Sequence, residues 1–209
     1  MSPSALRSET LRRFAAWRLA PNPSLPLVES LAELRPKSPS QVAARATAAG
    51  YVAAVCFGAP ADKVRKDLDR FALWDHLSAE EQALIVNPEV SAQSTSFHSW
   101  LIESIQFMAW GLGIATLDHF TPCSDTLASQ FPKAGTDPSL FIANAQLRPL
   151  DELLQEVDTL YMLHWFAVEA NLTGRYDERI VLPRISFRRH AADWMVGVVD
   201  GWEEVPLDT

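Results

Sequence analysis

Five ionisable side chains lie in or beside strongly apolar stretches of the sequence, where a charge needs an explanation. They are Arg45, Glu103, Arg148, Asp158 and His164. Glu103 or Asp158 could act as a general acid or base, His164 could carry a proton, and Arg148 could hold an anion. A buried charge is costly unless it is paired and hydrogen-bonded, so we expect these groups to find one another, backbone groups or water.

The spacing of these residues limits how they can pair. Asp158 and His164 are six residues apart, which does not place them side by side on one helix. We therefore expect pairs between helices, in which Asp158 or His164 contacts Arg189 or His190 near the C-terminus.

Glu103 is expected to pair with Arg45 or Arg148 in the same way. Two interpretations remain open: a polar network that fixes helix register, or an active or ligand-binding site. The structural interpretation is favoured, because ion pairs that only hold a fold together perturb pKa values as active sites do, so buried charges alone do not indicate an active site.

The sequence lacks the usual spacings of a metal or cofactor site. It has no HExxH, no closely spaced cysteine pair and no Glu-x-x-His. His98 and Glu103 are five residues apart, as are His164 and Glu169, and that offset does not bring two groups onto one helix face. We expect no metal and no cofactor.

The large aromatic residues have a core interpretation and a binding interpretation. At helical spacing such side chains usually pack inward. Some of them could instead line a groove closed by the segment 115–146 and bind a small molecule or a peptide. The residues predicted to bind are the arginines and tryptophans Arg45, Arg148, Arg189, Trp100 and Trp165.

Apolar periodicity and capping signals predict an all-α protein. The stretch 149–170 is apolar on nearly every side and is expected to be the buried central helix of a multi-helix bundle. Residues 115–146, with three prolines, are expected to be irregular with short helical turns. The other helices are expected at 4–19, 38–57, 61–76, 78–86, 96–113 and 183–198.

Length and charge bound the class of protein. A chain of 209 residues with no evident linker predicts one helical domain over 1–209. The net charge of −8 argues against nucleic-acid binding. Two distant cysteines, no apolar run of about 20 residues and no signal-peptide pattern predict a soluble cytoplasmic protein that is not in the membrane.

A series of short patterns, in order along most of the chain, resembles the domain-of-unknown-function family 4272. The resemblance implies a mainly helical fold and implies no particular activity. The chain departs from the family pattern at Leu101, Met162 and Phe187, where charged residues are usual. The patterns are RSETLRRFAAWRLAPNPSLPLVES, SPSQVAARATAAG, SWLIESIQFMAWGLG, LRPLDELLQEVDTLYMLHWFAVEA, FRRHAADWM and WEEVPLDT.

Two hypotheses of function follow from the sequence. The first is a protein-interaction or accessory module, whose acidic balance favours a basic protein partner. The alternative is a small-molecule binder or hydrolase-like enzyme with a polar pocket around Glu103, Arg148, Asp158 and His164. The sequence does not decide whether the protein is an enzyme, and it says nothing of the oligomeric state.

Overall fold

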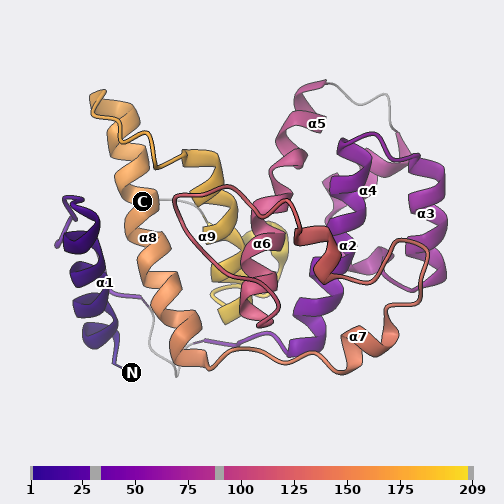
Figure 1. The fold of residues 1–209 in the computed structure, drawn as a ribbon, viewed down its shortest axis with the longest axis horizontal. Helices are drawn as coiled ribbons and strands as arrows, with labels where there is room; N and C mark the ends of the chain where they lie inside the picture. Colours follow the sequence, from indigo (N-terminus) through magenta and orange to yellow (C-terminus); the bar gives the residue numbers. More distant parts are fainter. Residues whose placement is uncertain (1, 29–33, 88–91, 207–209) are drawn as a thin grey trace. The chain divides into compact units, whose positions relative to one another are not determined.

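The computed structural model describes residues 2–28, 34–87 and 92–206 (Figure 1). This part of the chain contains α-helices, short 3-10 helices and no strand, so the predicted all-α class is confirmed. Its internal contacts divide it into two compact units. Unit 1 comprises Met1–Lys37, Asp118–Thr121 and Arg148–Thr209, and unit 2 comprises Ser38–Leu117 and Pro122–Leu147. The single domain over 1–209 stays a prediction.

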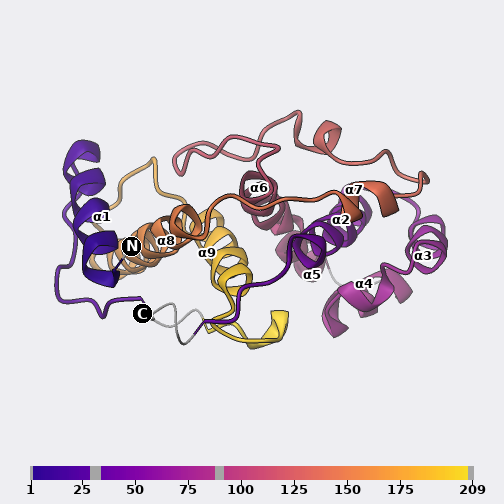
Figure 2. The same cartoon turned by 90° about the horizontal axis from the view of Figure 1, so that it is seen from below.

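Unit 1 is organised around the helix expected to be central. Helix α8 (Leu150–Thr173) packs against both α1 (Pro3–Trp17) and α9 (Leu182–Val196), and lies between them in Figures 1 and 2. A short 3-10 helix, η3 (Trp202–Glu204), follows α9. Leu154, Leu160 and Leu163 of α8 are at most 1% exposed. The buried central helix is therefore the core of this unit.

The end of α9 is fixed by a close backbone approach. Gly197 ends the helix with a φ of +76°, and a Cβ at this position would lie 1.9 Å from the carbonyl oxygen of Arg35. Lys37 N–H donates to the carbonyl oxygen of Met195 at 2.9 Å. Only glycine fits here, and the helix stops at Val196, two residues before its predicted end.

Unit 2 is organised around α2 (Pro39–Cys56). A capping box begins this helix at its predicted start, since Ser38 and Gln41 each accept a backbone N–H of the other at 3.2 and 2.8 Å. Small side chains let neighbouring helices approach α2 closely, and Ala43, Ala48 and Ala49 are fully buried. The other helices of unit 2 are α3 (Ala61–Arg70), η1 (Trp74–His76), α4 (Ala79–Val86), α5 (Ala92–Ser99), α6 (Leu101–Gly111), η2 (Leu127–Gln130) and α7 (Ser139–Ala143).

The helix predicted over 61–76 ends early, at Arg70. Ala72 adopts a left-handed conformation (φ +54°), and Leu73 N–H donates to the carbonyl oxygen of Leu68 at 2.8 Å. These are the features of a Schellman cap, in which Leu68 and Leu73 are both buried. No glycine marks this cap, so the sequence pattern did not reveal it.

The helix predicted over 96–113 is two helices, α5 and α6, that meet at Trp100. Trp100 N–H donates to the carbonyl oxygen of Phe97 at 3.1 Å, and Glu103 N–H donates to that of Trp100 at 2.9 Å. These are three-residue bonds of the 3-10 kind, which interrupt the α-helical ladder.

The segment 115–146 is irregular as predicted, apart from η2 and α7. Its part in unit 2 contacts α2, where Gly135 N–H donates to the Tyr51 hydroxyl at 3.2 Å. Among the described residues, no helix is both long and apolar enough to cross a membrane.

Candidate functional site

Asp158, a predicted catalytic residue, is committed to a buried ion pair. Its side chain is 0% exposed and pairs with Arg7 of α1. Arg7 Nε lies 3.1 and 3.2 Å from the two carboxylate oxygens, and Nη2 lies 2.9 Å from Oδ1. The guanidinium also donates to the carbonyl oxygens of Leu25 and Pro26 at 2.8 and 2.6 Å. This arrangement joins α8 to α1 and to the segment that follows α1.

His164 has the predicted partner on the closing helix. Arg189 Nη1 lies 2.8 Å from His164 Nδ1, and Arg189 Nε lies 3.2 Å from the Asp193 carboxylate. An arginine N–H can only donate, so Nδ1 accepts and the neutral ring carries its hydrogen on Nε2. Burial, and then the charge of Arg189, lower the pKa of His164 to about 4. His164 is therefore a neutral hydrogen-bond acceptor at pH 7.

Arg45 forms a buried pair in unit 2 with Glu81, a partner that the sequence did not suggest. Its two terminal nitrogens lie 2.7 and 2.6 Å from the two Glu81 oxygens, and Nη1 also donates to the carbonyl oxygen of His76 at 2.9 Å. Burial alone would raise the pKa of Glu81, but Arg45 and the Ser78 N–H outweigh it and lower this pKa. The carboxylate also caps α4, as the capping box predicted.

Glu103 and its neighbour Gln106 organise the chain that follows α6. Glu103 is 2% exposed, and its Oε1 accepts the Cys123 N–H at 3.1 Å. Gln106 donates to the carbonyl oxygen of Thr116 at 2.7 Å and accepts the Ser124 N–H at 2.9 Å. Two polar residues of one helix thereby hold backbone groups of the irregular segment.

The remaining predicted binding residues are less buried. Arg148 is part-exposed and pairs with Glu152, four residues later, at 3.3 Å. Trp100 and Trp165 are half-buried. The predicted polar pocket draws on both units, with Glu103 in unit 2 and Arg148, Asp158 and His164 in unit 1, and it stays a prediction.

A histidine–carboxylate pair in unit 1 was missed by the sequence analysis. His119 Nε2 lies 2.7 Å from Glu156 Oε2, while Arg13 Nη1 lies 2.6 Å from Glu156 Oε1. Burial alone would raise the pKa of Glu156, but His119 and Arg13 outweigh it and lower this pKa. His119 Nδ1 is buried without a hydrogen-bond partner. His119 lies in the segment read as irregular, where no periodicity relates it to Glu156.

Two arginines of α9 hold the backbone around His119. Arg184 donates to the carbonyl oxygen of Phe120 at 3.0 Å, and Arg188 donates to those of Asp118 and Thr121 at 2.6 and 2.9 Å. Trp17 packs edge-on against the rings of His119 and Phe120. The segment 118–121 is thus fixed to unit 1 through both its side chains and its backbone.

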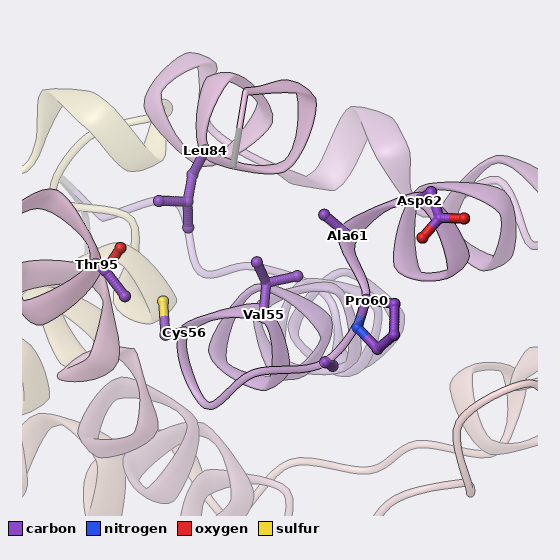
Figure 3. A pocket seen from close by; sticks show the side chains of 8 residues that line it. Val55, Cys56, Pro60, Ala61, Asp62, Leu84 and Thr95 are labelled. Atoms are coloured by element: carbon purple, nitrogen blue, oxygen red, sulfur yellow. The ribbon is translucent and has the colours of Figure 1, made fainter. Parts of the chain in front are cut away.

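A pocket of about 470 Å³ lies in unit 2, and none of the paired residues described above lines it. Leu84 and Val55 face one another across it, and Cys56 and Thr95 lie at one end while Asp62 lies at the other (Figure 3). The volume falls in the range of small-ligand pockets, and the wall is mostly apolar with few polar groups, as such pockets are. The lining residues are Val55, Cys56, Ala59, Pro60, Ala61, Asp62, Leu84 and Thr95.

The polar groups of this pocket differ in charge. Burial, and then the negative charge of Glu81, raise the pKa of the Cys56 thiol, which is therefore a neutral and weak nucleophile at pH 7. Asp62 is the charged member of the wall, in the first turn of α3. In the part of the chain that the structure describes, neither the Asp62 carboxylate nor the Thr95 hydroxyl has an ion-pair or hydrogen-bond partner.

No three His, Cys, Asp or Glu side chains gather closely enough to hold a metal ion within residues 2–28, 34–87 and 92–206.

Comparison with known proteins gives one family and no individual relative. No curated protein and no solved structure matches the chain significantly. The model of the domain of unknown function DUF4272 matches residues 7–205, nearly the whole chain. The chain therefore belongs to the DUF4272 family.

Proposed function

We propose that this protein is a binding module without catalytic machinery of its own, and that its binding site is the pocket between the α2–α3 turn, α4 and α5. The observation that carries the proposal is the contrast between the residues predicted to do chemistry and the residues that line the pocket. Asp158 and His164 are tied into buried pairs and Glu103 accepts a backbone N–H, whereas the pocket presents mainly apolar side chains with polar groups that have no partner in the described chain.

The contacts that Asp158 makes with Arg7 and His164 makes with Arg189 support binding rather than catalysis. A general base must reach a substrate proton, but Asp158 is fully buried and both of its oxygens accept from Arg7. His164 presents its Nδ1 to Arg189, so this basic nitrogen is already occupied. Both arrangements fit a role in holding helices together.

The pocket offers the features of a recognition site. Leu84 is 3% exposed and forms part of a wall that α4 holds in place through its cap. Apolar walls supply most of the affinity in such sites, and a few polar groups orient the ligand. Cys56 contributes a neutral thiol, which favours binding over thiol chemistry. Since both cysteines are free thiols, the proposal includes a reducing compartment such as the cytoplasm.

The test is selection of a random dodecapeptide display library on the full chain, followed by binding measurements on the enriched peptides. Ala61→Phe fills the pocket from the start of α3, and Thr95→Phe fills it from α5. Ala143→Phe adds the same side chain to an exposed helix end that does not line the pocket. We expect both pocket variants to weaken binding at least about tenfold, as hot-spot losses do, and the control to leave it unchanged.

Circular dichroism of each variant checks that it keeps the parent's helix content. If peptides enriched on the parent bind both filled variants as tightly as they bind the parent, the pocket is not the binding site and the proposal fails.

A further inference from the structure

We infer that the occupant of this pocket is a segment of a partner protein that presents one large apolar side chain with a lysine or arginine beside it. The inference rests on the proposed function and goes further by naming the chemistry of the partner. Three observations carry it: the free carboxylate of Asp62, the exposed apolar residues at the ends of α2 and α4, and the charge of unit 2.

Asp62 is a solvent-exposed carboxylate without a protein partner in the described chain. It is exposed, lies in the first turn of α3, and has no ion-pair or hydrogen-bond partner there. On the same two helices Asp69 pairs with Arg65 at 2.7 Å and Glu81 pairs with Arg45, and neither of them lines the pocket. A free carboxylate at the end of an apolar pocket is complementary to a cation carried next to an apolar group.

Two large apolar residues are exposed at the ends of helices that line the pocket. Phe57 directly follows the lining residue Cys56 and is 67% exposed, and Val86, two residues after Leu84, is 66% exposed. A partner that buries such exposed apolar side chains gains from removing them from water. A small molecule inside the pocket would leave Phe57 and Val86 in water, whereas a polypeptide segment is long enough to extend beyond the pocket onto the surrounding surface.

The charge of the unit favours a basic segment. Unit 2 has ten acidic and six basic residues, a formal charge of −4. A negative unit speeds the encounter with a basic partner and disfavours an acidic one. At the opposite end of the pocket the Thr95 hydroxyl is uncharged and free, so it can accept from or donate to the backbone of the bound segment.

The experiment uses the peptides enriched from the same dodecapeptide library on the full chain, measured by fluorescence polarisation. We expect the enriched sequences to combine an aromatic or long aliphatic residue with lysine or arginine within a few positions. Asp62→Asn should weaken their binding roughly two- to fivefold, the effect of one partly exposed ion pair. The matched control is Asp125→Asn, which removes the same charge from an exposed position of unit 2 outside the pocket.

Salt supplies a second readout that loss of fold would not imitate. Raising the ionic strength from about 50 to about 300 mM should weaken binding to the parent and to Asp125→Asn, and should weaken binding to Asp62→Asn less.

The outcomes separate this inference from the proposed function. If the enriched peptides are sensitive to Ala61→Phe and Thr95→Phe but carry no basic residue, or bind Asp62→Asn like the parent, the partner chemistry is wrong and the pocket remains the site. If both filled variants bind every enriched peptide as tightly as the parent does, but small apolar molecules bind the parent and not these variants, the occupant is a small molecule and the inference is overturned. If the binding of peptides and the binding of small molecules are both unaffected by filling the pocket, the proposed function fails as well.

Discussion

Acidification from pH 7 to pH 5 should destabilise this protein through one buried histidine. His164 is 5% exposed and accepts a hydrogen bond from Arg189, so protonating it would place two cations in contact in a buried site. Its pKa is lowered from 6.5 to about 4 by burial and by the charge of Arg189. Between these two values the unfolded chain binds a proton that the folded chain does not bind.

The sign and size of the effect follow from linkage. Because the unfolded state binds more protons, stability is fully present above pH 6.5 and is lost as the pH falls toward 4. Each unit of pKa difference corresponds to about 1.4 kcal/mol, so the loss attributable to His164 is roughly 2 kcal/mol at pH 5 and roughly 3 kcal/mol at pH 4. Such a loss is a large part of the 5–15 kcal/mol that holds an ordinary domain folded.

The assay is urea unfolding of the full chain, followed by circular dichroism and tryptophan fluorescence at pH 7 and pH 5. His164→Gln keeps an acceptor for Arg189 and cannot titrate, so it should lose about 2 kcal/mol less than the parent between the two pH values. His76→Gln is a comparison variant, because burial and then the charge of Arg45 also lower the pKa of that half-buried histidine and its removal should reduce the loss in the same direction. If the parent and His164→Gln lose the same stability from pH 7 to pH 5, the assignment of a depressed pKa to His164 is wrong.

Three further changes test the remaining buried contacts. Asp158→Asn should destabilise the chain by about 3 kcal/mol, because Arg7 keeps its charge in a buried site; a urea midpoint within error of the parent's would contradict this. The pKa of Glu81 is lowered in the folded protein, so the Glu81 carboxylate stabilises the fold above about pH 4.5 and this contribution is lost below that pH. Glu81→Gln should therefore reduce the fall in melting temperature between pH 5 and pH 3. Ala72→Gly should raise the free energy of unfolding by up to about 1 kcal/mol, because Ala72 occupies a left-handed conformation that glycine adopts without strain; a loss of stability would refute the cap assignment.

The helices with local signals were predicted well from the sequence, and their exceptions have local causes. Helices α2 and α4 begin at serine capping boxes that the sequence displays. The end of α3 depends instead on Ala72 in a conformation that alanine rarely takes, held because Leu68 and Leu73 pack together beneath it. Burial, rather than propensity, decides that boundary, so a single sequence could not reveal it.

For the candidate site residues, too, the sequence predicted what depends on neighbouring residues and missed contacts between residues far apart in the chain. Spacing alone established that Asp158 and His164 must find partners on other helices, and the Arg189–His164 contact confirms one of the predicted pairs. The partner of Asp158 is Arg7, which is 151 residues away on α1 and was not among the expected partners. The face of α1 that carries Arg7 is buried only because α8 packs against it, and no periodicity of α1 reveals this.

In the described part of each unit a buried arginine–carboxylate pair joins segments distant in the sequence, Arg7 with Asp158 and Arg45 with Glu81. Removing one partner of such a pair leaves a buried charge at a cost of about 3–5 kcal/mol, so the pairs penalise any helix register that separates them. Residues under that constraint cannot also exchange partners with a ligand during a binding cycle without threatening the fold. The groups that remain available for recognition are ordinary exposed ones such as Asp62, which look unremarkable in the sequence. What distinguishes Asp62 is its place at the end of an apolar pocket formed by residues of α2, α3, α4 and α5.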